Sequence, residues 1–320
     1  MDRTQMLFSL FDNRGFGLEV GGSYGALVRK SLGFNVETFD HADADTLRQK
    51  YKNIDSPIED VTYVSDGRGL FDIIGKPDRY DFIVASHVIE HVTDIVRFLQ
   101  DCSALLKPSG VLVLAVPDKR YCFDVLRPVS TVGQALQAYA EKRTRHSPGV
   151  IYDSLATTCM KSNEIVWREP TLDDIALSHD PEGAHSFFEA VLKTDDYNDT
   201  HGWMFTPSYF RYFIKTLRSL GYFQLGEKEF HMNSGTDRPM HEFYMTLSKR
   251  APALNVTDLD LLKASHVELA EIAISRQRQV DIGAITAELS RVTAERDALL
   301  RSASWKITAP LRKLKMAFSQ

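Results

Sequence analysis

The sequence predicts an α/β fold built on a mostly parallel sheet, and three observations lead to this prediction. Short apolar runs recur along the first part of the chain, as is typical of buried strands. Segments with helical signals separate these runs, and glycines or prolines end most of them. Hydrophobic residues make up 43% and charged residues 25% of the 320 positions, which excludes a wholly disordered chain.

The expected strands and helices alternate along the chain. Strands are expected at residues 17–20, 35–39, 61–64, 81–85 and 111–116, and a hairpin is expected from the runs 224–232 and 242–248. One helix is expected at residues 23–32, with Ser23 as its N-cap and Gly33 as its stop, and another at residues 92–106. Such a sheet is covered by helices on both faces and binds its ligand beyond the carboxyl ends of the strands.

The composition changes near residue 250. Residues 245–304 contain no aromatic residue and a single glycine, Gly283, which predicts a long helix. Apolar residues recur there at heptad spacing, with a slip at residues 280–283, so a coiled coil joining copies of the chain is expected. A helix packed back onto the first domain is the alternative. The expected parts are a domain at 1–250 with an insertion at 117–220, a helical extension at 251–304 and a basic amphipathic tail at 305–320.

Charge and cysteine content exclude several classes of protein. The net charge is −5 and the pI about 6.1, which argues against nucleic acid as a partner. The basic tail predicts contact with an anionic membrane surface or a partner. Three scattered cysteines without a Cys-x-x-Cys pair argue against a disulfide scaffold or a zinc site and for a reducing compartment. Without a visible signal or membrane-spanning segment, we expect a cytoplasmic protein, peripheral at the inner membrane face.

Glycines follow the first expected strand, in the segment Glu-Val-Gly-Gly-Ser-Tyr-Gly at residues 19–25. Glycines at this place let the backbone approach a ligand closely, although they also serve a simple tight turn. Asp40 ends the second strand, where an acid commonly binds ribose hydroxyls. Glu19 would repel a pyrophosphate but suits the cationic groups of S-adenosylmethionine, which has no phosphate.

These motifs together resemble the class I S-adenosylmethionine-dependent methyltransferases. The resemblance covers about residues 15–249 and rests on Glu-x-Gly-x-x-x-Gly, the acids after strands two and three, the block Tyr-Asp-Phe-Ile-Val-Ala-Ser-His-Val-Ile-Glu-His at residues 80–91, the segment 106–112 and the final hairpin. It implies a Rossmann-like seven-stranded sheet whose last strand is antiparallel. The chain has Ser23 where the family favours glycine, although Gly22 stands beside it.

The resemblance also implies which residues bind S-adenosylmethionine. Glu19, Gly21, Gly22 and Gly25 would line its methionine end, Asp40 would hold the ribose, Asp66 and Gly67 would flank the adenine, and Ser86 would lie near the reactive methyl. Transfer to a hydroxyl also needs a base, and the pKa range of histidine suits this role. We expect His87 to be the base, and His91, four residues on, to be the second candidate or a packing residue.

The insertion is expected to contact the substrate, because long insertions at the ligand edge usually do so. The candidates are Asp118, Lys119, Arg120, Tyr121, His146 and His201, with a salt-bridged turn and structural histidines as the alternatives. No clustered carboxylate pattern indicates a metal, and none is predicted.

The function predicted from these features is O-methylation of a sugar hydroxyl in cell-surface glycan biosynthesis. The segment Ser-Trp-Lys-Ile-Thr-Ala-Pro-Leu-Arg at residues 304–312 resembles the tails of bacterial surface-polysaccharide enzymes, which favours a glycan acceptor. A catalytically silent scaffold in a glycan-assembly complex is one alternative. A nicotinamide-dependent sugar enzyme is another, which Glu19 and the final hairpin disfavour.

Overall fold

A computed structural model describes residues 2–232 and 241–302, without the side chains of residues 273–283. The expected sheet is confirmed: its seven strands lie in the order β3-β2-β1-β4-β5-β9-β8. Their bounds are β1 Gly17–Val20, β2 Val36–Asp40, β3 Tyr63–Val64, β4 Tyr80–Ser86, β5 Leu106–Pro117, β8 Gly226–His231 and β9 Glu242–Ser248. β1 to β5 pair in parallel, whereas β9 is antiparallel to both β5 and β8.

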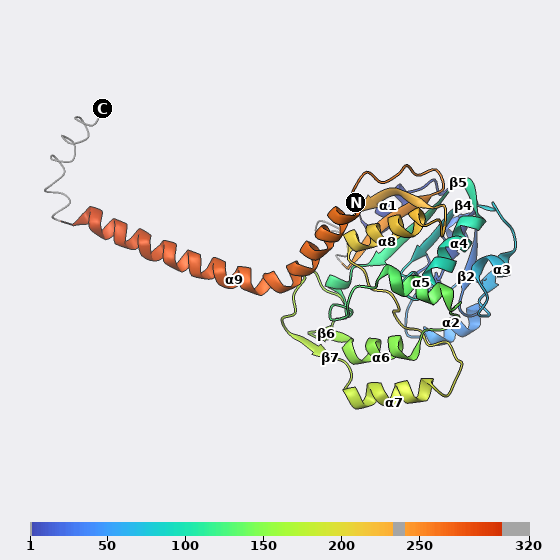
Figure 1. Ribbon diagram of the computed structural model, residues 1–320, viewed down its shortest axis with the longest axis horizontal. Coiled ribbons are helices and arrows are strands. Elements are labelled where there is room, and N and C mark those ends of the chain that lie inside the picture. Colours follow the sequence, from blue (N-terminus) through green and yellow to red (C-terminus); the bar gives the residue numbers. More distant parts are fainter. Residues whose placement is uncertain (1, 233–240, 303–320) are drawn as a thin grey trace. The chain divides into compact units, whose positions relative to one another are not determined.

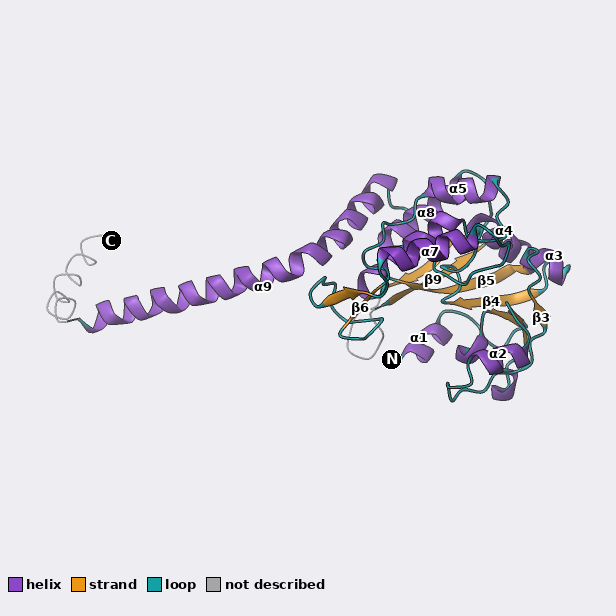
Figure 2. Ribbon diagram, turned by 90° about the horizontal axis from the view of Figure 1, so that it is seen from below, coloured by secondary structure: helices purple, strands orange, loops and turns teal. Residues whose placement is uncertain are grey.

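Helices cover both faces of this sheet (Figure 2). They are α1 Arg3–Ser9, α2 Ala44–Lys50, α3 Leu70–Ile74, α4 Ile95–Leu105, α5 Val132–Ala140 and α8 Pro207–Ser219. Alternate side chains of β4 serve the two faces, because successive residues of a strand point in opposite directions. Ile83 and Ala85 belong to the core on the side of α4 and α8, and Phe82 and Val84 to the core that includes Leu7 of α1.

The prediction of a helix at residues 23–32 is wrong. Two short 3-10 turns, η1 Ser23–Gly25 and η2 Lys30–Leu32, take its place. Backbone amides in the middle of the segment are used elsewhere: those of Leu27 and Val28 donate to the Glu19 carboxylate, at 2.6 and 3.1 Å. An α-helix would need these amides for its own i−4 carbonyls.

The second expected helix begins later than residue 92. Asp94 is its N-cap and accepts a hydrogen bond from the Arg97 amide at 2.9 Å, so α4 starts at Ile95. Residues 87–94 therefore form a turn between β4 and α4 and not a helix.

The insertion after β5, residues 117–220, has its own small elements. These are η3 Lys119–Tyr121, α5, α6 Pro148–Thr157, the two-stranded sheet of β6 Cys159–Lys161 and β7 Ile175–Leu177, and α7 Pro181–Val191. α6 and α7 lie side by side, with β6 and β7 at their end (Figure 1). The last part of the insertion, α8, packs Phe210 and Phe213 into the core of the sheet.

The long C-terminal helix is confirmed as α9, Asp258–Arg301, and the chain divides into two compact units at residues 1–272 and 273–320. The start of α9 belongs to the first unit: Leu261 is 2% exposed, and Glu268 accepts hydrogen bonds from the Ser208 amide and hydroxyl. For residues 258–272 the alternative, a helix packed onto the first domain, is therefore the better description. The first unit thus extends beyond the expected boundary at residue 250. The expected tail at 305–320 lies outside the described residues.

The described helices include none that is long and apolar enough to cross a membrane.

Candidate active site

A cavity of about 1510 Å³ lies at the carboxyl ends of β1 to β4, where the sequence places the ligand. All eight residues expected to bind the cofactor line this cavity: Glu19, Gly21, Gly22, Gly25, Asp40, Asp66, Gly67 and Ser86. His87 and His91 line it as well. The insertion contributes part of the wall through Tyr139, Ala140, Lys142, Arg143, Thr144, Asp195, Asp196, Tyr197 and Asp199.

The glycine loop after β1 is held in one shape. Gly21 has φ +66°, and a Cβ there would lie 2.6 Å from Cγ2 of Val88, so the position requires glycine. Ser23, two residues after Gly21, also has a positive φ of 44°, and its amide donates to Asp40 Oδ2 at 2.9 Å. Among the described residues the buried Ser23 hydroxyl has no hydrogen-bond partner, although it belongs to the cavity wall. It is therefore available to a bound molecule.

Glu19 holds the segment that follows the glycine loop through backbone hydrogen bonds. Its carboxylate accepts the hydrogen bonds from the Leu27 and Val28 amides and is buried. Burial raises the pKa of Glu19 to about 7, against the opposing effect of the two amides. The sequence predicts a contact with the methionine end of a cofactor, and the structure adds this second role in the folding of the loop.

Two further acids follow the next strands. Asp40 is buried at the end of β2, and its Oδ1 contacts His41 Nδ1 at 2.7 Å. Asp66 follows β3 and binds Arg68 through two nitrogens, at 2.9 and 2.7 Å. The amide of Ser65, just before it, donates to the Asp40 carbonyl at 2.8 Å, so the two strand ends are joined.

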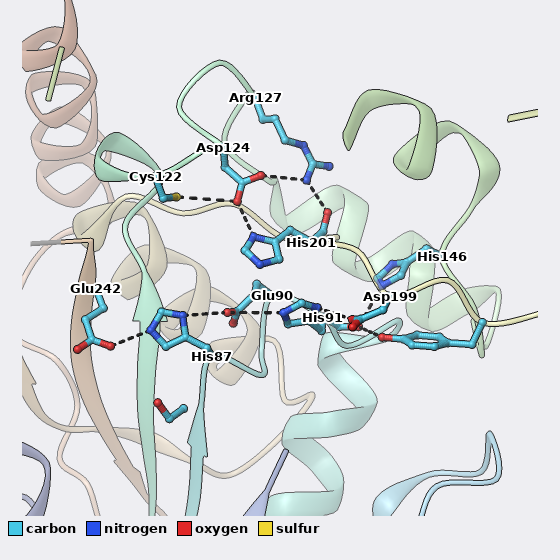
Figure 3. A network of polar contacts seen from close by, with 12 residues as sticks. His87, Glu90, His91, Cys122, Asp124, Arg127, His146, Asp199, His201 and Glu242 are labelled. Carbon is cyan, nitrogen blue, oxygen red and sulfur yellow. Dashed lines mark hydrogen bonds and ion pairs between the residues drawn. The ribbon is translucent and has the colours of Figure 1, made fainter. Parts of the chain in front are cut away.

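His87 stands at the end of β4 between two carboxylates (Figure 3). Its Nε2 hydrogen bonds with Glu242 at 2.8 Å, and its Nδ1 lies 3.4 Å from Glu90. Burial lowers the pKa of His87, but the two carboxylates outweigh burial and raise it to about 9. A raised pKa favours the protonated ring at neutral pH, and the expected role of His87 as the base stays a prediction.

Glu242 and Arg3 hold this histidine, and the sequence analysis missed both. Arg3 binds Glu242 at 2.6 and 3.0 Å, and it also donates to the Ser86 hydroxyl at 2.7 Å. Glu242 opens β9, directly opposite Pro117 of β5. Their sequence positions lie far from the cofactor motifs, so only the sheet order brings them to this edge.

His91 lies in the turn after β4, and no helical turn relates it to His87, since α4 begins at Ile95. Its Nδ1 lies 2.8 Å from Asp199 of the insertion, and the Asp199 carboxylate lines the cavity beside it. Asp199 was also missed, because a single acid in a long insertion has no distinguishing pattern.

The substrate candidates at residues 118–121 are buried away from the cavity wall. Arg120 binds Asp118 at 2.6 Å and Glu271 of α9 at 2.6 Å, and Lys119 Nζ donates to the Val125 carbonyl at 2.7 Å. Tyr121 packs in a small separate core with Trp167. The structure therefore favours the salt-bridged alternative for this segment.

The two substrate-candidate histidines of the insertion, His146 and His201, are not part of the cavity wall, and Figure 3 shows them beside His91. His146 Nε2 hydrogen bonds with the His91 carbonyl at 3.0 Å, and burial lowers the pKa of His146 to about 4. His201 Nδ1 hydrogen bonds with Asp124 Oδ2 at 2.5 Å, and its ring meets that of His91 edge-on, with 4.6 Å between the centroids. Both histidines thus support His91.

The fold and the site together define a class I S-adenosylmethionine-dependent methyltransferase. A protein-family model described as "Methyltransferase domain" matches residues 1–210, about two thirds of the chain, and the chain belongs to this family. S-adenosylmethionine is its cofactor. The glycine cradle at Gly21, the free Ser23 hydroxyl and the buried Asp40 carboxylate fit this molecule.

Curated relatives match over short stretches. A ubiquinone biosynthesis O-methyltransferase of Rhodopseudomonas palustris (strain TIE-1) is 33% identical over 81 residues, 25% of this chain and 26% of the relative. One from Bradyrhizobium sp. (strain ORS 278) is 41% identical over 44 residues, 14% and 17% of the two chains. The chain thus spans about a quarter, or less, of the length of these relatives.

Solved structures match the fold only distantly. A putative S-adenosylmethionine dependent methyltransferase from Listeria monocytogenes has 14% identity and a TM-score of 0.39, over 77% of this chain and 97% of that one. An S-adenosylmethionine dependent methyltransferase from Mesorhizobium loti has 12% identity and a TM-score of 0.39, over 76% and 95%.

Proposed function

We propose that this methyltransferase transfers the methyl group to a hydroxyl of a sugar in cell-surface glycan biosynthesis. The observation that carries the proposal is the single cavity that joins the glycine loop to a polar wall from the insertion. Pockets for single drug-sized ligands measure about 300–1,000 Å³, so a cavity of about 1510 Å³ has room for an acceptor beside the cofactor. Lys142, Arg143, Asp195, Asp196 and Tyr197 give this wall donors and acceptors that suit a polyhydroxylated molecule.

The chain's own residues bind and orient the two reactants. S-adenosylmethionine supplies an activated methyl group on its sulfonium. The Ser23 hydroxyl, Asp40 and the loop at Asp66 would hold it, as their positions on the cavity wall allow. The acceptor hydroxyl would lie beside Asp199 and His91 on the opposite wall, where their polar atoms can orient it toward the methyl group. Alignment of donor and acceptor then does most of the work.

The first experiment measures cofactor binding by calorimetry with S-adenosylmethionine, its demethylated product and NAD. We expect the two sulfur compounds to bind and NAD not to bind. Asp40→Asn should weaken binding, whereas Asp45→Asn should leave it unchanged, because the Asp45 side chain is 94% exposed on α2 and outside the cavity wall. Failure of both sulfur compounds to bind would reject the enzyme.

The second experiment identifies the acceptor class with radiolabelled S-adenosylmethionine. Sugars, nucleotide sugars and glycan extracts form one arm, and dihydroxylated phenols form the other, since the curated relatives are called ubiquinone biosynthesis O-methyltransferases. Label on the sugar arm supports the proposal, and label on the phenol arm alone replaces the glycan by an aromatic acceptor.

A catalytically silent scaffold remains the second candidate. It is favoured by Ser23 in the glycine loop and by the Glu19 carboxylate, which is occupied by the backbone amides of Leu27 and Val28. The calorimetry decides between the two, since a silent scaffold that has lost its cofactor site would bind neither sulfur compound.

The proposal also includes a cellular location, the cytoplasm at the inner face of the membrane. It is supported by the basic, amphipathic composition of residues 305–320 and by the glycan acceptor. Flotation of the full chain with anionic and with neutral vesicles tests it, and equal flotation with both would remove the electrostatic part of the proposal.

A further inference from the structure

A cluster of potential metal ligands lies beside the cavity (Figure 3). It consists of Glu90 and His91, in the turn after β4, and His201, in the insertion before α8. One ligand atom from each of the three residues lies within 4.8 Å of the other two. The backbone fixes this arrangement, because the amides of Gly202 and Trp203 donate to the Glu90 carbonyl at 2.6 and 3.3 Å.

The Glu90 carboxylate is buried without a close partner. Its residue is 1% exposed, and among the described residues neither of its side-chain oxygens accepts a hydrogen bond. The nearest ring nitrogens are His87 Nδ1 at 3.4 Å and His91 Nε2 at 4.0 Å. His87 already binds Glu242 closely through its other nitrogen. Arg3 already pairs with Glu242, so the His87 ring is the nearest charge partner of Glu90, and both Glu90 oxygens keep their acceptor capacity for a bound cation.

Both histidines are oriented as metal ligands commonly are. His91 Nδ1 lies 2.8 Å from Asp199, and His201 Nδ1 hydrogen bonds with Asp124 at 2.5 Å. In each ring the Nε2 is therefore the nitrogen available for an ion. For His201 the hydrogen bond to the carboxylate fixes the ring and increases its basicity, an arrangement typical of histidines that bind metals. For His91 the Asp199 carboxylate is an ion-pair neighbour without hydrogen-bond geometry.

The supporting residues are themselves held in place. Asp124 also contacts Arg127 at 3.4 Å, and both of these side chains are buried. The His91 carbonyl accepts hydrogen bonds from His146 Nε2 at 3.0 Å and from the Tyr197 hydroxyl at 3.3 Å. His146 thus holds the backbone of His91, and His201 is itself one of the three potential ligands. A metal site would explain why both histidines lie here, whereas methyl transfer alone requires neither.

We propose that Glu90, His91 and His201 bind one divalent metal ion at the acceptor side of the cavity. Two imidazoles and one carboxylate suit Zn²⁺, or Mn²⁺ and Fe²⁺, better than Ca²⁺. Metal–ligand bonds of about 2.0–2.2 Å bring ligand atoms closer together than 4.8 Å, so the side chains rotate inward on binding. Three protein ligands leave coordination positions open to water or to an acceptor oxygen.

The position of His91 links the ion to the chemistry. Of the three ligands, His91 belongs to the cavity wall, next to Asp199. An ion on its Nε2 would polarise an acceptor hydroxyl and help it to lose its proton before the oxygen attacks the methyl carbon. This role rests on the proposed methyl transfer, whereas binding of the ion does not depend on it.

The test measures the metal content of the full-length protein. The protein is stripped with EDTA, dialysed against Zn²⁺ and analysed by mass spectrometry for bound metal, and Co²⁺ is loaded in parallel for its visible absorption. We expect about one ion per chain, and a Co²⁺ spectrum typical of low coordination with nitrogen ligands. Glu90→Gln and His201→Ala should each weaken Zn²⁺ binding by at least about tenfold.

Matched controls come from an exposed pair on α7. Glu189 and His185 lie 4.0 Å apart at the surface, so Glu189→Gln and His185→Ala change the same residue types outside the cluster. They should retain the metal content of the wild type. Circular dichroism of each variant shows whether it has folded.

Two results would overturn the proposal. One is a folded wild-type protein without Zn²⁺ and without Co²⁺ absorption, which would mean that the His87 imidazolium alone balances Glu90. The other is retention of the ion by both cluster variants. The wild-type Co²⁺ spectrum decides even if a variant fails to fold. If the protein binds metal but not S-adenosylmethionine, the proposed function is rejected and the metal site is kept. If it binds S-adenosylmethionine but no metal, the metal site is rejected and the proposed function is kept.

Discussion

At the scale of single residues, Glu19 couples the shape of the glycine loop to pH. Its pKa is about 7 in the folded chain, against an ordinary value of 4.5. The folded state therefore keeps a proton that the unfolded state loses between these two values. The contribution of Glu19 to stability falls as pH rises through this window, in total by about 3 kcal/mol, and is then constant.

The first prediction concerns the removal of this titration. Glu19→Gln should abolish the fall in unfolding free energy between pH 4.5 and 7, because an amide does not ionise. Chemical denaturation at a series of pH values measures the slope. Glu169→Gln is the control, since Glu169 is exposed and should leave the slope as in the wild type. The same slope in Glu19→Gln would contradict the assignment.

The second prediction concerns Gly21, where space and backbone both require glycine. Gly21→Ala places a Cβ against Val88 at a φ of +66°, so it should destabilise the fold by about 1–3 kcal/mol and weaken cofactor binding. Gly149→Ala is the control, because a Cβ there meets nothing within 4 Å. Adding Val88→Ala should recover part of the loss, since it relieves the clash and not the backbone strain. Denaturation and calorimetry measure both effects.

At the scale of elements, the strands could be predicted and the loop after β1 could not. A strand of the central sheet is a local apolar run, and β1, β2, β4 and β9 appear within one or two residues of their expected bounds. The segment after β1 also looks helical locally. The amides of Leu27 and Val28 donate to the Glu19 carboxylate instead. Helix propensity describes single residues and cannot predict such a contact across a turn.

The candidate site divides in the same way. The cofactor residues follow strand ends, a rule that needs only the strand order, and all of them line the cavity. The acceptor side depends on contacts between distant segments. Arg120 was expected in the site but is buried with Asp118 and with Glu271, 151 positions away, and Glu242 reaches His87 from the last strand. Sequence spacing gives no signal for such pairs.

The third prediction concerns the start of α9, which the structure joins to the first unit. Leu261→Ala should lower the unfolding free energy by about 2–4 kcal/mol, because Leu261 is 2% exposed. Leu299→Ala is the matched control on the same helix, since Leu299 is 63% exposed and should change it by less than about 0.5 kcal/mol. Equal effects of the two substitutions would show that residues 258–272 do not pack on the first unit.

At the scale of the whole molecule, the part of the second unit whose side chains are described, residues 284–302, has apolar residues exposed along one helix. Ile285, Leu289, Val292 and Leu299 follow one another at intervals of four, three and seven, and each is at least 46% exposed. Arg291 forms ion pairs with Glu288 and Glu295, which stabilise the helix itself. This heptad spacing is that of a coiled-coil seam, so the self-association expected from the sequence stays a prediction with a definite surface.

The last prediction tests this surface. Leu289→Glu together with Val292→Glu places two charges in the seam and should shift the full chain toward the monomer, as measured by sedimentation equilibrium over a range of concentrations. Ala287→Glu with Ala294→Glu adds the same charges at positions that a heptad register places outside the seam, so this pair should associate as the wild type does. Because all four positions lie in the second unit, cofactor binding should be unchanged in both pairs. A monomeric wild type, or an equal shift by both pairs, would reject the seam and leave this helix as a site for a different partner.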